Sequence, residues 1–322
     1  MDRAASRSPH REDPQPDTHL PLRSILVVVD PTAHEQPALE KATRIASRCG
    51  SRLELYVCDV EQQLPESWAG GARFGQYREL RRNQLLQELD AIAQPLRARG
   101  LAVDVVCEWH APLEQGIGEH AIRTQPDLVV KETHRHAQPP HANLGSTDWN
   151  LIRMVPMPLL LVRARPWPSG VRIAAAVDPC HPADRPVALD AAIVGGSIAL
   201  GRVLDATPDV FHVLQMPPHL PGDRVSLEEL AAAHSRARVA VAQLAHGTDA
   251  GMHFIEGTVP EGLEHLAEEH LPDVLVVGTV ARPRSIHAAA GGTAARVLER
   301  VDCDLLVLKP PGFVSPLLIT AQ

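Results

Sequence analysis

Four small residues that could hold a phosphate group follow one short apolar run near the end of the chain. Residues 274–277 are apolar and mostly β-branched, which predicts a strand buried on both faces, and Gly278 ends it. The following loop closes on Gly291 and Gly292, and Thr293 opens a helical pattern. Glycines let a phosphate approach the backbone, and the unpaired N–H groups of a helix start attract anions. The loop is therefore a candidate phosphate site, and the alternative is that its glycines only make turns.

A second group of reactive side chains follows two predicted strands in the first half of the chain. His110 follows one strand, and His134 and His136 follow another that ends at Glu132. Parallel strands end at one edge of a sheet, so these imidazoles could meet around a metal such as zinc, with Asp30, Glu132 or water completing the shell. Two alternatives are a polar pocket for an anionic or amphiphilic small molecule and a hydrogen-bonded loop network. The chain has 17 histidines, so some of them cluster by chance.

The composition indicates two domains with aliphatic cores. A length of 322 residues suits two domains of ordinary size, and 44% of the residues are hydrophobic. Only 3% are aromatic, so the cores must be built from Leu, Val, Ile and Ala. Layers of helix and sheet packed with small aliphatic side chains fit this composition.

Charge and cysteine usage narrow the classes of partner and compartment. The formal net charge is −8 and no long basic block occurs, which argues against nucleic acid as a main partner. No apolar stretch reaches the length that spans a membrane, so we expect no membrane insertion. Residues 1–22 lack an apolar signal-peptide core and are predicted to be a disordered tail. The five cysteines are scattered without a Cys-x-x-Cys motif, which suits a reducing cytoplasm.

The chain is an internal repeat. The apolar run ending in Asp30 and Pro31 returns in the run ending in Asp178 and Pro179, and the run that begins at Asp127 returns at Asp273. One module of about 147 residues is therefore present twice. Prolines and a glycine at 164–170 mark the join.

Each copy alternates strands with helices. The predicted strands are about 25–29, 53–58, 103–107, 127–131 and 159–163 in the first copy, and 173–177, 210–216, 252–256, 274–278 and 305–309 in the second. Helical periodicity lies between them, with Gly50 as a stop for one helix and Ser226 with Glu229 as a capping box for another. A helix between strands two and three implies right-handed crossovers and a parallel sheet.

The motifs at 273–310, 147–153, 36–39 and 166–168 resemble those of the tandem universal stress proteins, and most closely the E subgroup of that family. The resemblance covers nearly everything after the tail. It implies an α/β fold of two doubly wound domains, each with a five-stranded, mainly parallel sheet, packed as a pseudo-dimer through their last strands. The expected division is a tail at 1–22, a first domain at 23–166 and a second at 167–322.

The family's nucleotide loop has a glycine, two residues, a glycine, nine residues, a glycine and then a serine or threonine. In the second copy Gly278 and Gly291 match this pattern, while Ala281 replaces the second glycine. Gly292 stands at the hydroxyl position, and Thr293 follows one place late. The resemblance therefore implies a modified adenine-nucleotide site, for ATP or a related nucleotide, at these five residues.

Two further residues join the predicted nucleotide site. Arg282 lies on the loop and could neutralise phosphate, although it could equally be a solvated surface residue. Asp178 ends the first strand of the second copy, where family members often contact adenosine; its alternative role is an Asx turn with Pro179. In the first copy Glu132 replaces Gly278, and its carboxylate would repel a triphosphate, so we expect no ordinary nucleotide there.

These features predict a cytoplasmic stress-response protein that binds a small ligand without strong catalytic activity. The sequence has no Ser-His-Asp order, no His-Glu-x-x-His and no complete Walker loop. The alternatives are a weak nucleotide or metal-assisted hydrolase and a scaffold that binds no ligand. We expect either a monomer with an internal pseudo-dimer or a homodimer.

Overall fold

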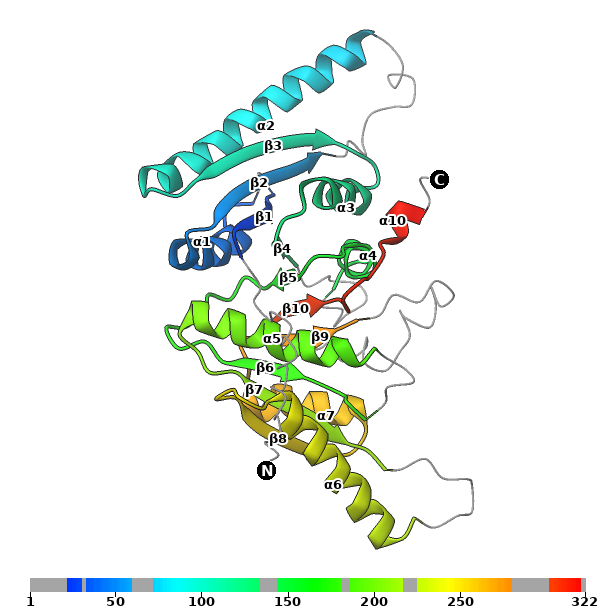
Figure 1. The fold of residues 1–322 in the computed structure, drawn as a ribbon. Helices are drawn as coiled ribbons and strands as arrows, with labels where there is room; N and C mark the ends of the chain where they lie inside the picture. The colour runs from blue at the N-terminus through cyan, green and yellow to red at the C-terminus, as the bar shows by residue number, and fades with distance from the viewer. Residues whose placement is uncertain are drawn as a thin grey trace, which may run out of the picture.

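The computed structural model describes residues 22–30, 33–59, 72–133, 144–180, 186–216, 225–279 and 301–319 (Figure 1). The elements of the first half are β1 (Ser24–Val28), α1 (Pro37–Cys49), β2 (Arg52–Asp59), α2 (Ala72–Ala98), β3 (Val103–Trp109), α3 (Leu113–Thr124), β4 (Leu128–Glu132), α4 (Ser146–Met154) and β5 (Leu159–Val162). Those of the second half are β6 (Ile173–Ala176), α5 (Val187–Leu204), β7 (Asp209–Leu214), α6 (Leu227–Leu244), β8 (Gly251–Glu256), α7 (Val259–His265) with a π-helical turn at Leu266–His270, β9 (Val274–Gly278), β10 (Asp304–Leu308) and α10 (Pro316–Ile319).

Within the described residues, the strands form one ten-stranded sheet in the order β3-β2-β1-β4-β5-β10-β9-β6-β7-β8. Neighbouring strands within each half are parallel. Among the described strands, the single antiparallel pairing joins β5 to β10, with Leu160 opposite Leu306, and reverses the strand direction between the halves. The prediction that the two last strands meet at the interface, as in a pseudo-dimer, is therefore confirmed.

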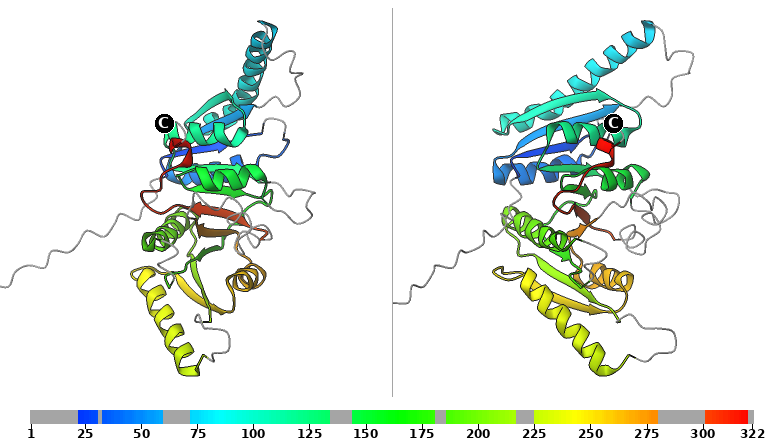
Figure 2. Two further views of the ribbon diagram at one scale, coloured as in Figure 1. Left: turned by 90° about the vertical axis from the view of Figure 1, so that its right-hand side faces the viewer. Right: turned by 45° about the vertical axis from the view of Figure 1, so that its right-hand side comes forward.

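Helices cover both faces of this sheet (Figure 2). Side chains from α1, α2, α5 and α6 pack into the hydrophobic core on one face, and side chains from α3, α4 and α7 pack into the core on the other. This is the three-layer α/β arrangement predicted from the alternation of strands and helices. Among the described residues, no helix has both the length and the apolar character needed to cross a membrane.

Local sequence signals correctly predicted the end of one helix and the start of another. Gly50 follows α1 in the left-handed conformation, with φ of 69°, and its N–H donates to the carbonyl of Ala46 at 2.8 Å. Glycine adopts this conformation without the steric cost of a Cβ atom. At the start of α6 the Ser226 hydroxyl accepts from the Glu229 N–H, while the Glu229 carboxylate accepts from the Ser226 N–H at 2.8 Å. The predicted capping box is thus confirmed.

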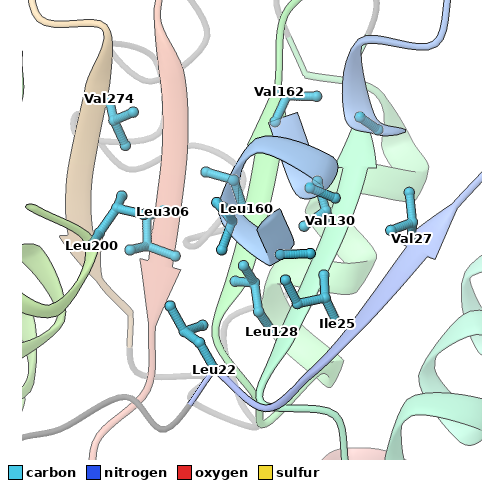
Figure 3. Close-up of a cluster of buried hydrophobic side chains, with 14 of the residues drawn as sticks. Leu22, Ile25, Val27, Leu128, Val130, Leu160, Val162, Leu200, Val274 and Leu306 are labelled. Atoms are coloured by element: carbon cyan, nitrogen blue, oxygen red, sulfur yellow. The ribbon is translucent and has the colours of Figure 1, made fainter. Parts of the chain in front are cut away.

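One hydrophobic core runs without a break across the boundary between the halves. Figure 3 shows Val130 and Leu160 of the first half facing the same layer as Leu306 and Val274 of the second. All four side chains are at most 2% exposed. Because the two halves share one apolar layer, separating them would expose this part of the core to water.

A buried ion pair reinforces the same boundary. The Lys41 ammonium on α1 donates to both carboxylate oxygens of Asp304 on β10, at 2.9 and 2.7 Å. The same carboxylate accepts from the Arg163 backbone N–H at 2.7 Å and from the Trp167 indole N–H at 2.6 Å. Burial lowers the pKa of Lys41 and raises that of Asp304, while their attraction opposes both shifts.

The segment after β10 returns from the second half to the first, where it covers the end of α4. The Lys309 ammonium donates to the carbonyl of Ile152, and the Ser315 hydroxyl donates to that of Met154 at 2.6 Å. These bonds satisfy carbonyls that a helix C-terminus leaves without partners. Burial lowers the pKa of Lys309 to about 7. The C-terminal segment is therefore a second link between the halves.

We predict that Asp304→Ala destabilises the protein by about 3–5 kcal/mol, because it leaves the buried Lys41 ammonium without its counter-charge, bonded only to the Arg163 carbonyl, and two N–H groups without their acceptor. Urea denaturation measures the change in the free energy of unfolding. The control is Asp104→Ala, which removes a half-exposed partner of Arg52 and should cost at most about 1 kcal/mol. Equal effects of the two substitutions would show that the buried pair contributes no more than a surface pair.

Candidate functional site

A cavity opens at the carboxyl ends of the strands in the second half. It has a volume of about 130 Å³ and lies between the ends of β6, β7 and β9 and the helix α7. Asp178 and Gly278 both line it, together with apolar side chains such as Phe211, Leu263 and Val277. The structure thus brings together the two residues of the predicted nucleotide site that it describes. Ligands of open parallel sheets bind at this edge.

The cavity has one polar corner, formed at the end of β6. The Asp178 N–H donates to the buried carboxylate of Asp190 at 2.9 Å, which fixes the turn after the strand. His212, which is 3% exposed, places Nδ1 at 3.0 Å from the Val177 carbonyl oxygen and at 4.0 Å from an oxygen of Asp178. A ligand in the cavity would therefore meet a carboxylate at one end and aliphatic walls at the other.

Gly278 has a packing role that does not depend on any ligand. A Cβ atom at this position would lie 2.7 Å from Leu189 Cγ and 2.8 Å from Ile193 Cδ1 of α5. Contacts this short force the helix to move, so glycine lets α5 sit close to the end of β9. Part of the glycine pattern therefore has a structural cause.

The remaining predicted nucleotide residues lie outside the described residues. They are Ala281, Arg282, Gly291, Gly292 and Thr293. Their role in holding phosphate stays a prediction.

At the corresponding helix start of the first half, charged side chains of the protein itself bind one another and the backbone. Asp148 of α4 is 2% exposed, and its carboxylate accepts from the Gly145 N–H at 2.9 Å and from the Thr133 hydroxyl at 2.6 Å. The Lys131 ammonium donates to the same carboxylate at 2.8 Å. An anion that bound this helix start would meet a carboxylate that already occupies the N–H group and the cation.

The sequence of the second half offers no equivalent of this network. In the repeat, Val277 corresponds to Lys131 and Ala294 corresponds to Asp148. A valine and an alanine supply neither the ammonium group of Lys131 nor the carboxylate of Asp148. The two halves therefore differ in sequence at the positions that hold the internal carboxylate. The expectation that the first half binds no ordinary nucleotide stays a prediction.

The predicted metal site is described only in part. His110 places Nε2 at 3.3 Å from a carboxylate oxygen of Glu119 and Nδ1 at 3.3 Å from the Pro112 carbonyl oxygen. His134 and His136 lie outside the described residues, so their convergence with His110 stays a prediction. Within the part of the chain that the structure describes, no group of three or more His, Cys, Asp or Glu side chains is arranged to hold a metal ion.

Comparison with known proteins identifies the family. The model of the universal stress protein family matches residues 21–163 and again residues 171–309. The chain belongs to the universal stress protein family. Universal stress protein E of Escherichia coli K12 is 26% identical over 310 residues, which cover 91% of this chain and 96% of that protein.

Two solved structures share the fold over nearly the whole chain. A functionally unknown protein, PA1789 from Pseudomonas aeruginosa PAO1, is 29% identical with a TM-score of 0.70, over 90% of this chain and 94% of that one. A universal stress protein from Archaeoglobus fulgidus has a TM-score of 0.61 at 16% identity, covering 91% of this chain and 98% of that one, and so supports the fold alone. The family assignment places the chain among stress-response proteins.

The sequence analysis of this universal stress protein did not identify several residues that shape the sites. Gly262 of α7 permits the close packing that shapes the cavity, because a Cβ there would lie 2.3 Å from Val213 Cγ2. Gly116 of α3 plays the same part in the first half, where a Cβ would lie 2.8 Å from Cys58 Sγ. The recurrence of both glycines in the repeat was a usable signal. The spacing of three residues from Gly145 to Asp148 was another, because it is typical of a helix start capped by a carboxylate.

The buried histidine of the first half is also a residue that the sequence did not single out. His120 is 3% exposed, and its ring stacks on Tyr56 with centroids 4.3 Å apart. Its Nε2 lies 2.5 Å from a carboxylate oxygen of Glu54, and its Nδ1 lies 3.3 Å from one of Glu108. Nothing in the local sequence distinguishes His120 from the other histidines, because its partners come from two different strands.

We predict that Asp148→Ala destabilises the protein by about 2–4 kcal/mol, since it removes a helix cap and leaves Lys131 and Thr133 without their buried acceptor. Chemical denaturation followed by circular dichroism measures this change. Asn150→Ala on the same helix removes two hydrogen bonds of partly exposed side chains, one donated to Glu114 and one accepted from Arg153, and should cost about 1–2 kcal/mol. A smaller effect for Asp148→Ala than for Asn150→Ala would contradict the described network.

Proposed function

We propose that this tandem universal stress protein is a cytoplasmic stress-response protein that binds an adenine nucleotide in its second half only. The base would enter the cavity beside Asp178. The phosphates would lie over Gly278 and at the helix start after Gly291. The first half would bind no nucleotide and would serve as the structural partner of the second.

The cavity in the second half is the observation that carries this proposal. Its walls are mostly aliphatic and aromatic, with a carboxylate and a histidine at one corner. Sites for whole small molecules measure about 300–1,000 Å³, so a cavity of about 130 Å³ suits one flat, mainly apolar part of a ligand. A purine base is such a group, while the sugar and phosphates of a nucleotide would extend toward the loop after Gly278.

The difference between the two halves gives independent support. Phosphate binds helix starts through unpaired N–H groups and a favourable helix dipole. In the first half the Asp148 carboxylate accepts from the N–H of Gly145 and pairs with Lys131. The second half has Ala294 and Val277 at those positions, so no internal carboxylate from these residues competes with phosphate.

Binding without strong catalysis suits the described side chains. Hydrolysis needs a base placed beside a nucleophile or a metal-bound water. Among the described residues that line the cavity, Asp178 and His212 could act as bases, but the Nδ1 atom of His212 lies close to the Val177 carbonyl oxygen. We therefore propose a sensor or store of nucleotide, and an assay of phosphate release tests the weak-hydrolase alternative.

We predict that ATP binds the wild-type protein and that Gly291→Asp weakens the binding at least tenfold, about 1.4 kcal/mol, because it places a carboxylate where phosphate would lie. Isothermal titration calorimetry measures both affinities. The matched control is Gly145→Asp at the corresponding position of the first half, which should leave the affinity unchanged.

Each result of this experiment decides between explanations. Equal affinity of the wild type and Gly291→Asp would place the nucleotide elsewhere, and a loss of affinity in Gly145→Asp would place it in the first half. Absence of ATP binding to the wild-type protein would leave the loop as a relic and end the proposal.

A further inference from the structure

A groove of about 460 Å³ runs along the outer side of α1, on the opposite face of the sheet from the nucleotide cavity. Its floor contains the buried side chains of Leu39 and Thr43 from α1 and Leu96 from α2. A groove of this volume is in the range of sites that hold small molecules, about 300–1,000 Å³. The groove shares no lining residue with the cavity beside Asp178.

The rim of the groove carries an excess of positive charge. Arg44, Arg48 and Arg99 line it, against the single carboxylate of Glu40. Arg48 pairs with the exposed carboxylate of Asp205. Among the described residues, no carboxylate forms an ion pair with Arg44 or Arg99. Two of the guanidinium groups that line the groove therefore have no ion-pair partner among the described residues.

Arg44 is held in place although no carboxylate in the described part of the chain pairs with it. Its guanidinium donates to the carbonyls of Trp167, Pro168 and Ser169, at 3.2, 2.8 and 3.2 Å, in the segment that joins the two halves. Carbonyl oxygens fix the side chain but leave its full charge in place. A cation fixed in this way binds an anion with little further loss of side-chain entropy.

The floor adds an unsatisfied hydroxyl group. Thr43 is 7% exposed, and its Oγ1 atom has no hydrogen-bond partner among the described residues. Buried polar groups in native proteins almost always have a partner. The Oγ1 atom is nearly covered by protein, so rotation of the Thr43 side chain about χ1 would be needed to bring the hydroxyl to an oxygen of a bound ligand.

We propose that the groove is a second ligand site, which binds a small anion with more than one negative charge, such as a phosphorylated metabolite. Arg44 and Arg99 would contact the phosphate, since guanidinium groups match its oxygens in a bidentate geometry. The Thr43 hydroxyl would bind a further oxygen, and Leu39 and Leu96 would contact the apolar part. Because Arg44 also holds the segment between the halves, the anion would bind beside that segment.

Inorganic pyrophosphate is the simplest probe, and calorimetric titration measures its affinity. Every protein in the series carries Gly291→Asp, so that the proposed nucleotide site does not contribute. We expect pyrophosphate to bind this background, Arg99→Gln to weaken binding at least fivefold and Thr43→Val at least twofold, with affinity falling as salt rises. The control Arg238→Gln, in the second half, removes an exposed guanidinium over Phe254 and should change nothing.

The proposal is wrong if the Gly291→Asp protein binds no pyrophosphate or if either groove variant binds it as tightly as that background. Both side chains can be replaced without disturbing folding, because Arg99 is exposed and valine matches threonine in shape. Circular dichroism and the thermal midpoint confirm that each variant is folded. A negative result with pyrophosphate would not affect the test of ATP binding by the second half, because the two proposed sites share no residue.

Discussion

The carboxylate of Asp304 is the group on which the joining of the two halves depends. It lies at the start of β10, next to the only antiparallel pairing among the described strands, and takes donors from α1, from the end of β5 and from the joining segment. An ionised carboxylate in a core is costly unless every oxygen is satisfied, so these donors must stay together. These bonds lie where β10 begins beside β5. β10 also pairs in parallel with β9, with Leu308 opposite Gly278, and so connects this boundary to the strand that lines the cavity beside Asp178.

The two copies of the repeat differ at the same edge of the sheet. Both halves place a glycine where the third helix crosses the second strand, and both end their fourth strand beside a predicted loop. In the first half that edge is closed by Lys131, Thr133 and Asp148, which satisfy one another. In the second half a cavity with a carboxylate at one corner lies at the corresponding edge. The two copies thus keep the same fold, while the ends of their fourth strands differ in sequence, with Lys131 and Glu132 in the first copy and Val277 and Gly278 in the second.

Much of the fold could be predicted from the sequence, because buried strands and amphipathic helices are local patterns. The predicted strands agree with the observed ones to within about two residues, and the Gly50 and Ser226 helix ends were read from neighbouring residues. The ion pair between Lys41 and Asp304 joins residues 263 positions apart, and no local pattern marks it. The same holds for the groove on α1, whose floor combines one helix with the far end of another. Asp178 and Gly278 were found because each follows a recognisable strand, while His212 was missed because its neighbours come from other strands.

Hydrogen exchange measured by mass spectrometry, with and without ATP, tests most directly the claim that only the second half binds nucleotide. Peptides that cover 289–296 and 274–279 report on the second half, and peptides that cover 143–150 report on the corresponding helix start of the first. The account predicts that saturating ATP slows exchange in the second-half peptides and leaves 143–150 unchanged, because the Gly145 N–H is already bonded to Asp148. Protection of 143–150 by ATP, or protection confined to the first half, would contradict it.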